Sequence, residues 1–61
     1  MKRAQEIVAE ALWVERNHGS GGRAFIASRI GALALTGDTA GIDRWKAIAA
    51  EFHRLQNGTT Q

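Results

Sequence analysis

The glycine–aspartate step Gly37-Asp38 divides the chain and separates two stretches of helical apolar spacing. Glycine readily adopts the left-handed conformation that closes a helix, and aspartate is a preferred residue at the N-terminus of the next helix. After this step, apolar side chains recur every three or four residues, which is the spacing of one helix face. They are Ile42, Trp45, Ile48, Ala49, Phe52 and Leu55. The pattern predicts a helix over about residues 39–56.

The N-terminal stretch has the same periodicity, in Ala4, Ile7, Val8, Ala11 and Leu12. It predicts a helix over about residues 2–17, which Gly19 can end in the left-handed conformation. His18 then lies near the helix C-terminus, where positive charge opposes the negative end of the dipole. Three glycines fall within residues 18–22, so a short flexible loop is expected there.

The segment between these two helices is apolar on almost every side. We predict a helix over about residues 23–36, with Arg23 and Arg29 as its only charged residues. A helix without a wide polar face is usually buried on several sides, so this one is expected to be the central helix. Its small residues lie in rows four apart, which let a neighbouring backbone come close.

The predicted fold class is therefore all-α, with three short helices in a small bundle. Residues 1–61 form a single domain, and residues 57–61 are expected to be a frayed tail. Only sixteen of the twenty-seven apolar residues are larger than alanine, and a domain of about 60 residues buries only about 60% of its unfolded surface. The bundle is either compact by itself or completed by dimerisation. We favour a dimer or a hetero-complex.

Several classes of protein are excluded or disfavoured by the same sequence. The chain has no cysteine and only two histidines, so no disulfide framework, metal site or cofactor site is expected. No motif of a nucleophile with its base is present, which argues against an enzyme and leaves no catalytic residues to assign. No apolar run approaches the ~20 residues of a membrane span, and charged residues interrupt the N-terminal stretch where a signal peptide would be apolar. A cytoplasmic protein without a small-molecule ligand is expected.

Trp13, Arg29 and Trp45 are the candidate interface residues. Tryptophan and arginine are enriched among the residues that dominate protein–protein binding energy. Trp13 does not lie at the centre of its own apolar stripe, which suits a contact residue. Arg29 interrupts an otherwise apolar helix, and it can extend to solvent, pair with a glutamate of the first helix, or anchor an interface.

DNA binding is a second hypothesis, because the sequence pI is about 10.0. The candidate contacts are Arg44, Lys46 and Arg54. The net charge is only +2, however, and the basic residues are scattered along the chain. In a helix-turn-helix reading, Asp38 and Asp43 would face DNA phosphates, which is repulsive. Nucleic acid is therefore the less favoured partner.

Two stretches, residues 25–38 and 40–49, carry a resemblance to a known family. Together with the preceding His18-Gly19 dipeptide, they resemble a family of short uncharacterised proteins from sphingomonad-type alphaproteobacteria. The resemblance covers roughly residues 4–55. It implies a bacterial, cytoplasmic, all-helical domain, and it brings no catalytic or ligand residues.

The hypothesis that follows is a non-enzymatic protein-interaction module. It is either a self-associating helical domain, such as a homodimer, or a small adaptor or inhibitor that docks on a larger protein. The alternative hypothesis is a small DNA-associated transcriptional regulator. Solution mass and DNA affinity distinguish the two.

Overall fold

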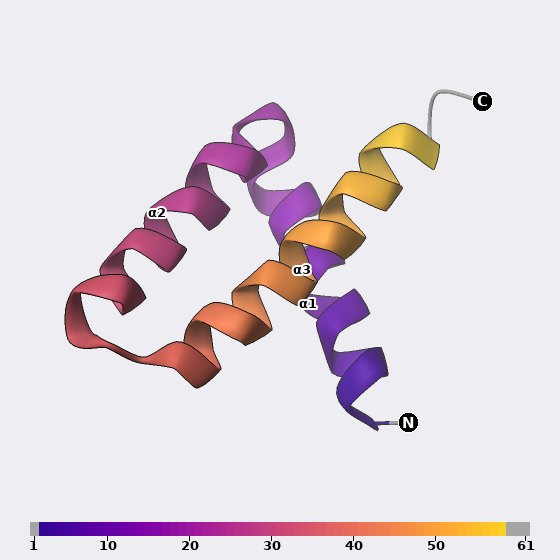
Figure 1. Cartoon of the computed structure of the whole chain (residues 1–61). Coiled ribbons are helices and arrows are strands. Elements are labelled where there is room, and N and C mark those ends of the chain that lie inside the picture. Colours follow the sequence, from indigo (N-terminus) through magenta and orange to yellow (C-terminus); the bar gives the residue numbers. More distant parts are fainter. Residues whose placement is uncertain (1, 59–61) are drawn as a thin grey trace.

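The computed structural model describes residues 2–58, which fold into a small all-helical bundle (Figure 1). Helix α1 spans Lys2–His18 and helix α2 spans Gly22–Thr36. Helix α3 spans Thr39–Gly58. A single 3-10 turn, η1, spans Gly19–Gly21 and joins α1 to α2.

The prediction of a flexible loop between the first two helices is wrong. Residues 18–22 form the end of α1, the 3-10 turn and the start of α2, so helical structure runs without interruption over residues 2–36. The three predicted segments therefore form two uninterrupted helical runs, the first of which bends at η1. The bend is possible because Gly19 has φ +51°, in the left-handed region that glycine enters without a steric penalty.

The break at Gly37-Asp38 is confirmed. Gly37 has φ +72°, its N–H donates to the Ala34 carbonyl, and the Asp38 N–H donates to the Leu33 carbonyl at 3.0 Å. This pair of bonds is the Schellman closure of a helix C-terminus. The Asp38 carboxylate then accepts a hydrogen bond from the Gly41 N–H at 2.9 Å, which caps the N-terminus of α3.

Helix α3 ends later than predicted. It continues to Gly58, so residues 57 and 58 belong to the helix rather than to a frayed tail. Residues 59–61 of that predicted tail lie outside the described part of the chain.

The central helix is α3 and not α2, which corrects the sequence expectation. Helix α3 packs along both other helices, whereas α1 and α2 meet mainly where η1 joins them (Figure 1). Helices α2 and α3 run antiparallel side by side, and α1 crosses α3. Only Gly22 and Ile26 of α2 are buried. An apolar composition therefore did not mean burial on several sides.

The core lies where α1 and α2 pack against α3. Its buried side chains come from all three helices: Ile7, Ala11, Val14, Ile26, Ile48 and Phe52. Gly22 is buried among them, and a Cβ built on it would overlap the Phe52 ring and come within 3.0 Å of Val14 Cγ1. Gly22 is thus a packing residue at the helix junction.

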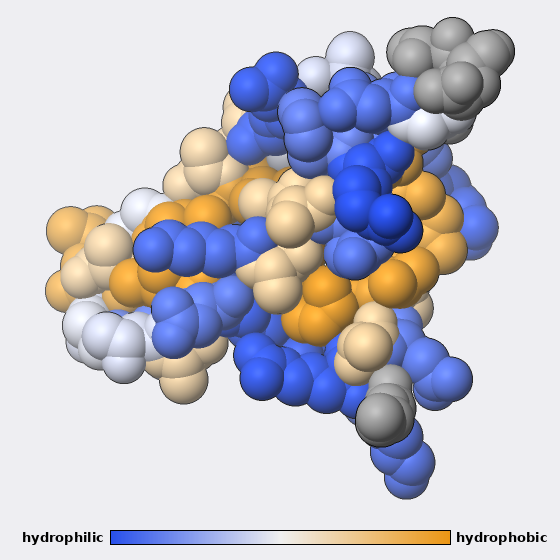
Figure 2. All heavy atoms as spheres, turned by 45° about the vertical axis from the view of Figure 1, so that its right-hand side comes forward, coloured by the Kyte–Doolittle hydropathy of each residue, from blue (hydrophilic) through white to orange (hydrophobic). Residues whose placement is uncertain are grey.

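The molecule is flatter and more extended than a typical compact domain of its size. Its principal extents are 38 × 28 × 16 Å, and its radius of gyration is 11.6 Å against about 10.5 Å for a compact chain of this length. Apolar side chains reach the surface between hydrophilic ones (Figure 2). Among the described residues, no helix is both long and apolar enough to cross a membrane.

Candidate protein-interaction surface

A cluster of aromatic rings connects the three helices on one side of α2. The ring of Phe25, in α2, lies 5.9 Å from that of Trp13 in α1 and 5.9 Å from that of Trp45 in α3. His18 stacks on Phe25 with centroids 4.0 Å apart and ring planes 16° apart, and its edge meets Trp13 at 5.6 Å. We call Trp13, His18, Phe25 and Trp45 the aromatic cluster.

Arg29 extends this cluster towards solvent. Its guanidinium carbon lies 5.6 Å from the centroid of the Trp45 ring, which is a cation–π geometry. The side chain is exposed and has no ion pair among residues 2–58, so the alternative in which it pairs with a glutamate of α1 is wrong.

The structure brings the three candidate interface residues together. Trp13 and Trp45 both contact Phe25, and Arg29 lies over Trp45. Trp13 remains 52% exposed, whereas Trp45 is half-buried. Helical spacing alone had not linked these positions, because they belong to three different helices.

Sequence reasoning missed His18 and Phe25 as members of this site. From the sequence, His18 is expected to oppose the helix dipole and Phe25 to belong to an apolar helix. The available signal was the short distance in sequence between two aromatic residues on either side of a glycine-rich bend. A bend of this kind brings the last turn of one helix beside the first turn of the next.

The three DNA-contact candidates do not form one uncommitted basic patch. Arg44 donates a hydrogen bond to Glu10 at 2.7 Å, which links α3 to α1, and this bond raises the pKa of Arg44 above its usual value. Arg54 pairs with Glu51 at 3.3 Å within α3. Lys46 is exposed and makes no ion pair with any described residue.

The side of α2 that points away from α3 is not covered by any other helix among residues 2–58. It consists of exposed residues at helical spacing, of which Ala27 also lines the edge of a groove between α2 and α3: Ala24, Ala27, Ser28, Gly31, Ala32 and Leu35. We call these six residues the outer face of α2. Leu35 is 90% exposed, and no atom lies within 4 Å of a Cβ built on Gly31. The outer face carries no charged side chain.

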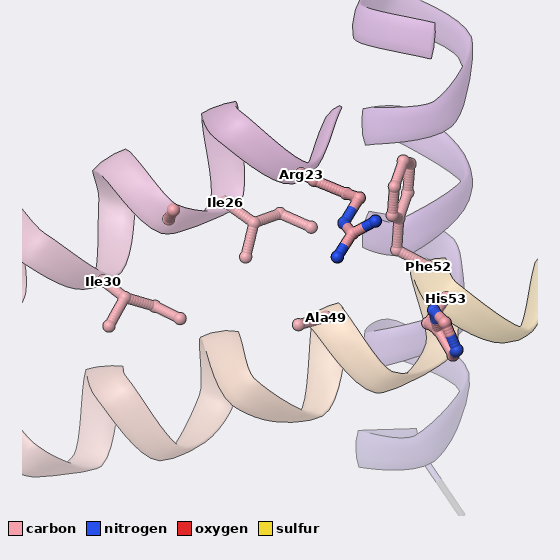
Figure 3. Close-up of a pocket in the computed structure, with 7 residues that line it drawn as sticks. Arg23, Ile26, Ile30, Ala49, Phe52 and His53 are labelled. Atoms are coloured by element: carbon pink, nitrogen blue, oxygen red, sulfur yellow. The ribbon is translucent and has the colours of Figure 1, made fainter. Parts of the chain in front are cut away.

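A groove of about 310 Å³ runs between α2 and α3 on the side opposite the aromatic cluster. Its walls include Ile26, Ile30 and Phe52, and Arg23 and His53 lie at one end (Figure 3). The Asn57 amide lies 2.9 Å from His53 Nε2 and can donate to it. The groove offers few polar groups, and residues 2–58 contain no group of three acidic or histidine side chains that could hold a metal ion.

Residues 3–60 match the model of a family of unknown function (DUF6961). The chain belongs to this family. Membership in DUF6961 agrees with the resemblance to an uncharacterised family, and the family description names no activity, ligand or partner. The DUF6961 chain matches no curated protein and no solved structure. Its function is therefore argued from its own geometry.

Proposed function

We propose that the protein is a non-enzymatic protein-interaction module that binds another helical surface through the outer face of α2. The observation that carries this proposal is the position of α2 in the bundle. The most apolar helix of the chain packs on α3 along one side only, and its opposite side holds a leucine that is 90% exposed. Burial of such a face in a partner removes apolar surface from water.

The aromatic cluster supports the same function. Trp13 and Arg29 are exposed at one flank of α2 and are held by ring contacts, so little side-chain freedom is lost when a partner covers them. Tryptophan and arginine in this setting are typical anchors of protein interfaces.

The DNA-regulator alternative has weaker support. Two of its three candidate residues, Arg44 and Arg54, are paired with carboxylates of the same chain, and each pair reduces the net charge presented to a phosphate. Lys46 alone gives no extended basic surface. The resemblance to proteins of sphingomonad-type bacteria supports the bacterial cytoplasm as the setting of the proposed interaction.

The test combines the mass of the purified protein in solution, measured over a range of concentrations, with thermal unfolding. For a self-associating module we expect a mass above that of the monomer and a melting temperature that rises with concentration, and for an adaptor a monomer with a low melting temperature. Gly31→Leu places a large side chain in the outer face without a clash in the free chain, and Leu35→Ser removes its largest apolar group. Both variants should reduce association while the helix content is kept.

Ala40→Leu is the matched control, because it adds an exposed leucine in the first turn of α3, away from the outer face. It should associate like the wild type. Duplex DNA shifts at two salt concentrations test the alternative. A stable monomer with a high melting temperature and no DNA affinity contradicts both functions, and salt-dependent DNA binding that is lost in Lys46→Ala favours the regulator.

A further inference from the structure

We infer that the partner of the outer face is a second copy of this chain, bound antiparallel through the same face, with the two-fold axis beside Gly31. This inference rests on the proposed function and names its partner and register. It is based on the shape of the outer face and on the accessible area of the chain.

Gly31 marks the place of closest approach. A glycine inside a helix costs about 0.5–1 kcal/mol relative to alanine, and a built Cβ at Gly31 meets no atom of residues 2–58 within 4 Å. Gly22, by contrast, is required by the ring of Phe52. Close packing of a second backbone against the outer face would explain the glycine at position 31, which no contact among the described residues requires. The crossing point of two helices is where a missing side chain lets them approach most closely.

Leu35 supplies a projection and the first half of α2 supplies a matching recess. With two antiparallel copies crossing beside Gly31, Leu35 of one copy lies level with Ala27 of the other along the helix axis. The outer-face residues around that level are the small Ala24, Ala27 and Ser28. Each leucine therefore enters a shallow recess on its partner, and two-fold symmetry forms this contact twice.

The contact proposed here carries no charged side chain. Arg23 lies in the groove between α2 and α3 rather than on the outer face, and the Asp38 carboxylate caps α3 (Figure 3). The six outer-face residues are uncharged, so the antiparallel contact is mainly apolar.

The accessible surface area of the chain is larger than that of a compact monomer of the same mass. The accessible area is 4404 Å², whereas a compact monomer of 6.6 kDa exposes about 3900 Å². A stable interface of standard size covers roughly 800 Å² on each partner. Contact along α2, widened by its flanks, would bring the area exposed by each copy below that of a compact monomer.

A cysteine cross-link tests the register, because the described chain has no cysteine of its own. A disulfide needs Cα atoms about 4.4–6.8 Å apart, a separation reached only by residues beside the two-fold axis. Gly31→Cys should therefore form a covalent dimer under mild oxidation. Ala24→Cys is the matched control on the same face, since its two copies would lie roughly 20 Å apart along antiparallel helices.

The expected result is at least about a tenfold faster cross-link at Gly31→Cys than at Ala24→Cys, because a bound partner raises the local thiol concentration. Equal cross-linking at both positions means a parallel pair and overturns the inference.

Other outcomes would contradict this dimer without contradicting the proposed function. A chain that dimerises by mass but does not cross-link at Gly31→Cys overturns the register and leaves a self-associating module. A poorly stable monomer that never dimerises overturns the second copy as partner and leaves an adaptor. A stable monomer without DNA affinity contradicts both the antiparallel dimer and the proposed function.

Discussion

The ring of Phe52, in α3, lies directly on the Cα of Gly22, in α2, at a place where a Cβ would overlap the ring. Phe52 is among the largest fully buried side chains, and Val14 of α1 closes the same contact. This contact therefore involves all three helices. Because it lies beside η1, it also fixes the angle at which the first helical run bends.

Gly22→Ala is expected to destabilise the fold by about 1–3 kcal/mol, because overpacking forces a buried ring or a helix to move. Chemical denaturation followed by circular dichroism measures the change. Gly21→Ala is the control: it is the neighbouring glycine, its φ is −86°, and a Cβ there meets no atom within 4 Å. Equal destabilisation by both variants would show that the Phe52 contact is not what requires glycine at position 22.

Gly31→Ala is expected to stabilise the free chain by about 0.5–1 kcal/mol, because alanine has the higher helix propensity and the added methyl group meets nothing in the chain. Thermal unfolding at low concentration measures the gain. Gly41→Ala is the matched comparison in α3, where the Cβ would lie 2.8 Å from Asp38 Oδ2 and disturb the helix cap. A gain at Gly41→Ala equal to that at Gly31→Ala would contradict this account.

His18→Ala is expected to lower the stability by about 0.5–1 kcal/mol, because it removes both the stack on Phe25 and the edge contact with Trp13. The free energy of unfolding should be measured together with tryptophan fluorescence, which reports the changed surroundings of Trp13. His53→Ala removes an exposed imidazole outside the aromatic cluster and should have the smaller effect. The reverse order would argue against a structural role for the stack.

The Glu10–Arg44 pair should show a favourable coupling between α1 and α3 in a double-mutant cycle of Glu10→Ala and Arg44→Ala. The coupling should shrink as salt rises, because both side chains are partly exposed. The cycle at Glu51–Arg54, an exposed pair within one helix, should give a smaller value. A coupling that is absent at low salt would mean that the pair does not fasten the two helices.

The raised pKa of Arg44 also fixes the sign of its pH dependence. The hydrogen bond to Glu10 raises the folded-state pKa, so the stabilisation is fully present below the unfolded-state pKa and is lost only as the pH rises through the folded one. The folded-state and unfolded-state pKa values of Arg44 both lie above the pH range in which the protein would be studied. Unfolding measurements between pH 7 and about 9 should therefore show no loss of the Glu10–Arg44 coupling through Arg44 deprotonation.

The sequence by itself determined the helical segments and the break between the last two. Local backbone chemistry was sufficient there: apolar spacing set the helices, the left-handed Gly37 closed α2, and Asp38 capped α3. Trp13, Arg29 and Trp45 could also be selected from residue type alone. These are properties of single residues or of neighbours along one helix.

Only the tertiary structure decided which helix is central and what the glycines do. The composition of α2 predicted burial, yet α3 is the central helix because it packs against both α1 and α2. Gly22 and Gly31 look alike in sequence, but one lies against Phe52 and the other faces open space. Contacts between distant segments are set by packing in three dimensions, which local periodicity does not encode.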